Sequence, residues 1–188
     1  DHKAREAGDK GPNTGGMGAF SPAPNVDPTL HKRIMDEIIN PTVRGLAEEG
    51  MPYLGFLYAG LMIDSHGNPK VLEFNCRLGD PETQPILMRL QSDLIALCLS
   101  AIEGRIDDYS LEWDSRYALG VVMVADGYPG DYPRGDEIHG LDQIDSPNIK
   151  VFHAGTRTEH HKILTDGGRV LCVTALGQTL IDAQKNAY

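Results

Sequence analysis

The chain has 188 residues, of which 40% are apolar, and a formal charge of -10 at pH 7. That length suits one or two domains, the apolar fraction suffices for a core, and the excess of acidic residues disfavours general binding to nucleic acid. Apolar runs are too short to cross a membrane, so neither a membrane nor nucleic acid is expected as a partner. The three cysteines (Cys76, Cys98 and Cys172) are odd in number and far apart, which disfavours a disulfide framework. We therefore expect a cytoplasmic protein.

The first fifty residues predict a loop followed by a helix. Residues 1–24 are polar and rich in glycine and proline, which is typical of a loop. A helix is expected over residues 28–49, because Asp27 can accept hydrogen bonds from its first turn and Pro28 suits the first helical position. Pro41 should kink or interrupt this helix, since proline has no backbone N–H to donate.

A β-hairpin and a second helix are predicted next. Residues 53–63 and 71–77 have the composition of strands, and the turn sequence between them indicates that they pair as a hairpin. A turn rich in helix-start residues follows at 79–85. Apolar periodicity then predicts a helix that continues to about Glu103.

A strand-rich unit is expected after a charged linker at residues 105–116. Its predicted helix begins near Thr179, and its predicted strands are residues 118–125, 151–154, 162–165 and 169–175. The Asp-Gly-Gly sequence between the last two strands is typical of a tight turn, so these strands should pair as a hairpin. We therefore predict an α+β fold of two domains, residues 1–110 and 111–188, with the second incomplete at its end.

Three polar side chains of the second hairpin strand form the first candidate site. Side chains alternate between the faces of a strand, so Glu73, Asn75 and Arg77 should share one face. An apolar layer should cover the other face, which carries Leu72, Phe74 and Cys76. Carboxylate and amide oxygens suit Mg²⁺, and a guanidinium suits a phosphate. A solvent-exposed strand face with a Glu–Arg pair is the simpler alternative.

The glycine-rich segment at residues 11–18 is the second candidate. Its four glycines could bring backbone N–H groups together into an anion site. The segment is neither a Walker A loop nor a G-x-G-x-x-G sequence. A mobile surface loop is the alternative, but Asn13 and Thr14, beside Gly15 and Gly16, add hydrogen-bonding groups that favour ligand binding.

The third candidate is the turn that enters the second helix, with Asp80, Glu82, Thr83 and Gln84. A helix start presents backbone N–H groups and the positive end of the helix dipole, so these residues could contact a polar substrate. Capping of the helix by Asp80 or Thr83 is the alternative interpretation, and both roles can use the same residues.

Taken in chain order, these segments resemble the phosphoribosylamine–glycine ligase family of the ATP-grasp superfamily. The resemblance rests on residues 11–19, 55–62, 73–77 and 79–84, and for the terminal domain on residues 127–132 and 167–171. It covers essentially the whole chain. Several long motifs in the same order are far more specific than any one of them.

The resemblance implies the later part of an ATP-grasp domain followed by a small strand-rich terminal domain. It implies an enzyme of purine synthesis that joins glycine to phosphoribosylamine through glycyl phosphate, with ATP as co-substrate and Mg²⁺ or Mn²⁺ as cofactor. Glu73 and Asn75 match the metal ligands, and Arg77 matches a catalytic residue near the transferring phosphate. The positions that match the substrate site or its border are Asn13, Thr14, Gly15, Gly16, Asp80, Glu82, Thr83, Gln84, Asp1 and Lys3.

Two other interpretations stay open. A different ATP-grasp carboxylate–amine ligase would share the acid and amide of the candidate strand but should lack the other motifs together. A non-catalytic module would bind ligand without releasing ADP. The family also has an amino-terminal domain and a segment that holds ATP, neither of which is in this chain. We therefore expect this stretch alone to be inactive, and the sequence leaves a monomer open.

Overall fold

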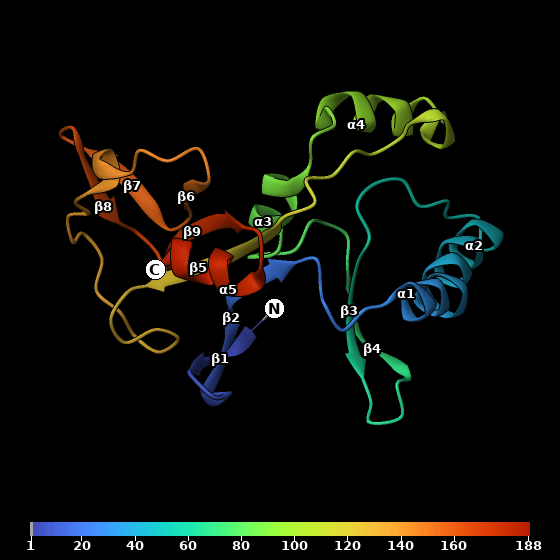
Figure 1. Cartoon of the computed structure of the whole chain (residues 1–188), viewed down its shortest axis with the longest axis horizontal. Coiled ribbons are helices and arrows are strands. Elements are labelled where there is room, and N and C mark those ends of the chain that lie inside the picture. The colour runs from blue at the N-terminus through green and yellow to red at the C-terminus, as the bar shows by residue number, and fades with distance from the viewer. Residues whose placement is uncertain (1) are drawn as a thin grey trace. The chain divides into compact units, whose positions relative to one another are not determined.

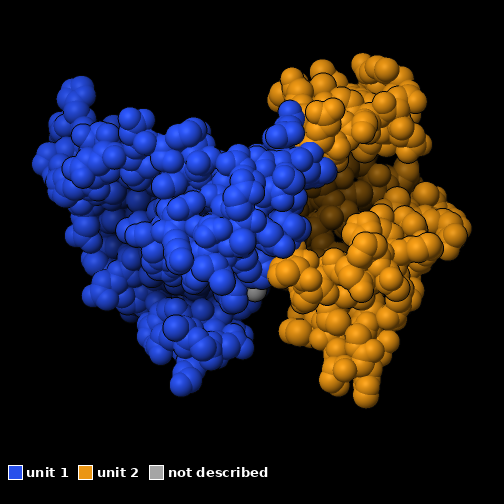
Figure 2. All heavy atoms as spheres, in the orientation of Figure 1, with its two compact units in different colours: residues 1–22, 80–91, 113–188 blue, residues 23–79, 92–112 orange. Residues whose placement is uncertain are grey.

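The computed structural model describes residues 2–188, and its helices and strands confirm the α+β class. The chain forms two compact units (Figure 2). Unit 1 comprises the described residues up to 22 together with 80–91 and 113–188, and unit 2 comprises 23–79 and 92–112. The domain boundary between residues 110 and 111 stays a prediction. Over the described range, no helix has the length and apolar character that a membrane span requires.

Unit 1 contains a five-stranded antiparallel sheet with the strand order β1-β2-β5-β9-β6 (Figure 1). The strands are β1 (His2–Glu6), β2 (Lys10–Ser21), β5 (Tyr117–Val124), β6 (Ile149–His153) and β9 (Arg169–Gly177). Helices α3 (Thr83–Arg89) and α5 (Leu180–Ala187) pack against this sheet. Its centre lies at β5 and β9, where Ala118, Thr174 and Ala175 are fully buried. The strands and the final helix predicted at β5, β6 and α5 are confirmed.

The expectation of a loop over residues 1–24 was wrong, because two strands occupy most of this segment. β2 pairs with β5, and Gly18 lies opposite Val121. A Cβ at Gly18 would lie 2.6 Å from the carbonyl oxygen of Gly120, so the two backbones approach closely only because glycine is present. The polar composition of the segment did not indicate a strand. One partner of β2 is the adjacent β1, but the other, β5, lies far along the chain.

The hairpin predicted between the strands at 162–165 and 169–175 was also wrong. β8 (Lys162–Thr165) pairs instead with β7 (Thr156–Glu159), whereas β9 pairs with β5 and β6. The turn between β8 and β9 crosses from the small hairpin to the main sheet. It packs against Gly155, where a Cβ would lie 2.5 Å from the Cα of Gly167. Gly167 therefore packs against the backbone of Gly155, and Gly168 packs against the ring of Tyr128, where a Cβ would lie 2.3 Å from Cδ2. Close packing, rather than a tight hairpin turn, accounts for both glycines.

Unit 2 begins with the predicted helix. It consists of α1 (Pro28–Ile34), a π-helical turn (Met35–Ile39) and α2 (Asn40–Glu48). Asp27 caps it as expected, because its Oδ1 accepts a hydrogen bond from the backbone N–H of Leu30 at 2.7 Å. The wider π turn ends at Ile39, two residues before Pro41, whose ring would clash with the carbonyl one turn earlier in a regular helix. The predicted interruption therefore takes the form of a π turn.

The hairpin of unit 2 is confirmed, but the second predicted helix is divided. β3 (Tyr58–Ile63) pairs with β4 (Pro69–Asn75) in antiparallel fashion. Leu90 is extended, and Asp93 caps a new helix by accepting a hydrogen bond from Ile95 at 2.7 Å. The break places α3 in unit 1 and the following helix in unit 2. The remaining elements are α4 (Leu94–Ile102) and two 3-10 turns, η2 (Ile106–Asp108) and η3 (Leu141–Gln143).

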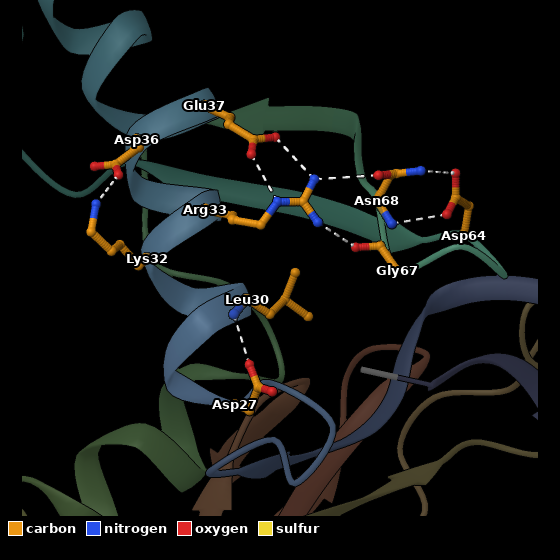
Figure 3. Close-up of polar contacts among 9 residues, drawn as sticks. All are labelled: Asp27, Leu30, Lys32, Arg33, Asp36, Glu37, Asp64, Gly67 and Asn68. Carbon is orange, nitrogen blue, oxygen red and sulfur yellow. Dashed lines mark hydrogen bonds and ion pairs between the residues drawn. The ribbon is translucent and has the colours of Figure 1, made fainter.

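Arg33 of α1 holds the turn of this hairpin (Figure 3). Its guanidinium donates to the carbonyl of Gly67 at 2.9 Å and to Oδ1 of Asn68 at 3.3 Å, and it pairs with Glu37 at 2.8 Å. Asp64 closes the turn by accepting a hydrogen bond from the Asn68 backbone at 2.8 Å, and this contact lowers the pKa of its carboxyl group. Helix α1 therefore positions the hairpin that carries the first candidate site.

Candidate functional site

Strand β4 presents Glu73 and Asn75 on one face of the hairpin, as strand alternation predicts. Glu73 pairs with Gly60 across the ladder, and Asn75 pairs with Tyr58. A Cβ at Gly60 would lie 3.0 Å from Cγ of Glu73 and 3.5 Å from its Oε1, so the glutamate side chain lies over the glycine. The register shift of the ladder falls between Gly60 and Leu61, so it leaves the alternation from Glu73 to Asn75 intact.

Arg77 lies outside this strand, because β4 ends at Asn75. The strand expected to reach residue 77 therefore ends two residues early, and the Nη1 of Arg77 donates to the carbonyl of Leu78 at 2.9 Å. The shared face of Arg77 with Glu73 and Asn75 stays a prediction. The apolar layer expected on the opposite face was wrong for the described chain. Leu72 is 65% exposed and Phe74 is 41% exposed, because the two-stranded hairpin has no covering layer there.

The glycine-rich segment lies in β2, where its backbone groups are engaged within unit 1. Oγ1 of Thr14 donates to the carbonyl of Lys3 at 2.8 Å and accepts from the N–H of Gly16 at 3.0 Å. The N–H of Gly15 donates to the hydroxyl of Tyr128 at 3.1 Å. Two amides required by the anion-site interpretation therefore already have partners, and the substrate role of the segment stays a prediction.

Arg169, at the start of β9, connects this segment to the turn at Asp80. Its Nη1 donates to the carbonyl oxygens of Gly15 at 3.0 Å and Asp80 at 2.9 Å, and its Nη2 donates to Oδ2 of Asp80 at 2.8 Å. Neither Arg169 nor Tyr128 was a site candidate in the sequence. No local pattern indicates a site at either residue. The only signal in the sequence is that both lie in the stretches that resemble the terminal domain, residues 127–132 and 167–171.

The residue at the N-cap of α3 is not one of the two that the capping interpretation named. Glu82 is the N-cap and makes no side-chain capping hydrogen bond, so neither Asp80 nor Thr83 fills that position. Oε1 of Gln84 is buried and accepts no hydrogen bond from the described residues. A buried acceptor without a partner costs about 1–3 kcal/mol, so a donor from a ligand would be stabilised there. Asn13 is exposed and pairs with Ala4 in the β1–β2 ladder.

The structure brings the predicted residues together in two sets. Glu73, Asn75 and Arg77 belong to unit 2, whereas the remaining described candidates belong to unit 1. The prediction for Asp1 lies outside the described residues. Within 2–188, no group of three or more His, Cys, Asp and Glu side chains is placed to hold a metal ion. A metal held by this chain would therefore take few protein ligands, as Mg²⁺ commonly does beside substrate phosphates.

A cavity of about 670 Å³ lies elsewhere in unit 1. Residues of β1, β2, β5 and the end of α5 line it, among them Arg5, Phe20, Leu119 and Gln184. None of the predicted site residues is part of its lining. Met17 and Gly18, at the end of the glycine-rich segment, also line it, so the cavity borders that segment but contains none of the residues predicted for the substrate site.

Comparison with known proteins identifies close relatives. Family models of phosphoribosylglycinamide synthetase match the chain, the ATP-grasp (A) domain over residues 1–83 and the C domain over residues 118–188. The phosphoribosylamine–glycine ligase of Allochromatium vinosum is 68% identical over 188 residues, which are 100% of this chain and 44% of that protein. The chain thus spans less than half the length of the curated relatives it matches.

Solved structures agree with this similarity. The crystal structure of phosphoribosylamine–glycine ligase from Thermotoga maritima matches with a TM-score of 0.84 and 36% identity, covering 100% of this chain and 46% of that one. N5-carboxyaminoimidazole ribonucleotide synthetase from Thermotoga maritima matches with a TM-score of 0.58 and 16% identity, covering 90% of this chain and 42% of that one. The second likeness concerns the fold alone.

Proposed function

Because the chain belongs to the phosphoribosylglycinamide synthetase family, we propose that it is part of an enzyme that uses ATP to join glycine to phosphoribosylamine. The products are glycinamide ribonucleotide, ADP and phosphate, in the de novo synthesis of purines (IMP). The observation that carries the proposal is the placement of Glu73 and Asn75 on one face of β4, in a chain that both models of this family match. We assign the activity to the full-length protein.

Glu73 and Asn75 fit a magnesium or manganese ion. Both supply hard oxygen donors, and Mg²⁺ is often bound by one or two protein oxygens together with phosphate oxygens of the substrate. Gly60 leaves space beside the Glu73 side chain. β3 contains no acidic residue, so Glu73 is the carboxylate that the two strands of the hairpin supply, and Asp64 is engaged in the turn. When bound, the ion would neutralise charge on the phosphates of ATP.

The residues of the chain would orient the reactants and exclude water. The carboxylate of glycine attacks the γ-phosphate of ATP, and the amine of phosphoribosylamine then displaces phosphate from glycyl phosphate. We assign to Arg77 the role of offsetting charge on the transferring phosphoryl group. The segment from Asn13 to Gly16 and the turn from Asp80 to Gln84 line the substrate site. Shielding this site matters, since an acyl phosphate reacts readily with water.

The substitution Glu73→Gln in the full-length protein tests the proposal. ADP release is measured with magnesium-ATP, glycine and phosphoribosylamine together, and with each left out in turn. The unaltered protein should require all three, and Glu73→Gln should lower kcat by about 100-fold or more because a charged metal ligand is lost. Glu48→Gln on α2, where the glutamate side chain is 72% exposed, is the matched control and should leave kcat unchanged. Near-normal turnover by Glu73→Gln would contradict the metal assignment.

Two further measurements address the other interpretations. A panel of carboxylic acids and amines would reveal a different ATP-grasp ligase, because another pair of substrates would then support ADP release. Calorimetry with magnesium-ATP would reveal a binding module, since such a module binds without turnover. The proposal also includes a cytoplasmic location, which the free thiols of Cys76, Cys98 and Cys172 support.

A further inference from the structure

Arg169 makes a contact that joins two distant segments of unit 1. Its guanidinium donates three hydrogen bonds, to the carbonyl oxygens of Gly15 at 3.0 Å and Asp80 at 2.9 Å and to Oδ2 of Asp80 at 2.8 Å. The Arg169 side chain is 23% exposed and that of Asp80 is 51% exposed, so water partly screens the ion pair, and the bonds to the two carbonyl oxygens fix the geometry of the guanidinium. We call this arrangement of Arg169, Gly15 and Asp80 the Arg169 clamp.

Gly15 is the residue that allows the clamp to form. A Cβ at this position would lie 3.0 Å from Cζ of Arg169 and 3.1 Å from its Nη2, so a larger residue would push the guanidinium away. The N–H of Gly15 donates to the hydroxyl of Tyr128 at 3.1 Å. Both backbone polar groups of Gly15 are therefore held by side chains from remote parts of unit 1, and these side chains set the position of the β2 segment relative to the Asp80 turn.

We propose that Arg169 is a positioning residue of the substrate site. The clamp holds the segment from Asn13 to Gly16 at a constant separation from the turn that carries Asp80 and Gln84, so that both segments contact the same substrate. Oε1 of Gln84, which is buried and has no donor among residues 2–188, supports a ligand contact on the Asp80 side of the clamp. This inference rests on the proposed function, because that function makes the two segments a substrate site.

Arginine is suited to this role by its shape. Its planar guanidinium presents several N–H donors in a rigid fork, whereas a lysine ammonium is a compact point charge. Lysine at position 169 would keep the ion pair with Asp80 but would not reproduce the bonds to both carbonyl oxygens. The variant Arg169→Lys should therefore lie between the unaltered protein and Arg169→Ala in every measurement of the clamp.

Steady-state kinetics of the full-length protein test the positioning role. Arg169→Ala should lower kcat/KM for glycine, for phosphoribosylamine or for both by about 10- to 100-fold, because small misplacements of a substrate are costly. The two separate values identify which substrate the clamp positions. The KM for ATP should stay within about twofold, since the residues assigned to the metal belong to the other compact unit. Arg169→Lys should recover part of the loss.

Arg157→Ala is the matched control. Arg157 lies on β7 of the same unit and also makes several polar contacts, to Glu159 at 3.2 Å, to the Thr165 carbonyl at 3.3 Å and to Asp166 at 3.1 Å. None of these partners is a predicted substrate residue, so Arg157→Ala should leave all three kinetic values unchanged. Equal kinetic changes in both variants, no change in Arg169→Ala, or an equal rise in KM for ATP would overturn the proposal.

Hydrogen–deuterium exchange provides a readout that does not depend on activity. Arg169→Ala should increase exchange in peptides that cover residues 10–21 and 80–89, whereas Arg157→Ala should not. If the unaltered protein lacks ligase activity, the proposed function fails while this comparison still decides whether the clamp orders the two segments. Unchanged exchange in Arg169→Ala would overturn the clamp itself.

Discussion

Replacing Asp114 with asparagine should destabilise unit 1 in a pH-dependent manner. The carboxylate of Asp114 accepts hydrogen bonds from the backbone N–H of Arg116 at 2.8 Å and from its guanidinium at 3.0, 3.1 and 2.6 Å. Arg116 also donates to Oδ1 of Asn148 at 2.8 Å, just before β6. Arg89 of α3 donates to the carbonyl oxygens of Asp114 and Arg116 at 3.1 and 2.9 Å. The carboxylate thus holds Arg116, whose guanidinium reaches Asn148, while the backbone carbonyls of Asp114 and Arg116 accept the bonds from α3.

The magnitude follows from the pKa of Asp114. The hydrogen bonds from Arg116 lower this pKa from 3.8 to about 2, and the side chain is only 14% exposed. A shift of this size contributes about 2 kcal/mol to the free energy of unfolding at neutral pH. Because the pKa is lower in the folded state, the contribution is complete well above pH 4, falls to about half near pH 3 and disappears below about pH 2.

Urea unfolding at pH 7 and pH 3 measures this effect. Asp114→Asn should lower the free energy of unfolding by about 2 kcal/mol at pH 7 and by about half of that at pH 3. Glu48→Gln is the control, because Glu48 and Arg44 are 3.9 Å apart and both 72% exposed, and such surface pairs contribute little. An equal loss for Asp114→Asn at both pH values, or no loss at pH 7, would refute the reasoning.

Three further predictions follow from close contacts. Gly60→Ala would place a Cβ 3.0 Å from Cγ of Glu73 and displace this proposed metal ligand. It should raise the magnesium concentration that gives half-maximal turnover about tenfold while leaving thermal unfolding unchanged. Gly177→Ala would place a Cβ 2.1 Å from the backbone nitrogen of Ala183, so it should displace α5 and lower the free energy of unfolding by about 2–3 kcal/mol in urea. Arg33→Ala removes the bond to the turn of the β3–β4 hairpin, so it should increase hydrogen exchange at residues 64–68 but not in β9.

Each of these predictions has an outcome that contradicts it. An unaltered magnesium dependence in Gly60→Ala would show that the glutamate moves aside without consequence. A wild-type unfolding midpoint in Gly177→Ala would show that α5 accommodates the extra methyl group. Unchanged exchange at the turn in Arg33→Ala would show that the bonds within the turn, including those accepted by Asp64, hold it without the helix.

Much of unit 2 could be predicted from the sequence because its signals are local. The helix start depends on Asp27 and Pro28, whose effects act within one turn. The β3–β4 hairpin depends on a short turn between two strands that are adjacent in the chain. The shared face of Glu73 and Asn75 follows from the period of two in a strand. The order of the family motifs is likewise a property of the sequence alone.

Only the tertiary structure decided the strand character of the first segment and the partners of β9. β2 pairs with the adjacent β1 and with the distant β5, and nothing in its polar, glycine-rich composition indicates the distant partner. The contacts of Arg169 reach across 154 positions to Gly15 and 89 positions to Asp80, so no local pattern could identify them. The sequence by itself determined elements with a strong local signal, such as the helix capped by Asp27 and the β3–β4 hairpin, although it missed the local β7–β8 hairpin. Pairings between remote segments depend on which surfaces meet after the chain has folded, and that is why the tertiary structure alone revealed the clamp beside the candidate site.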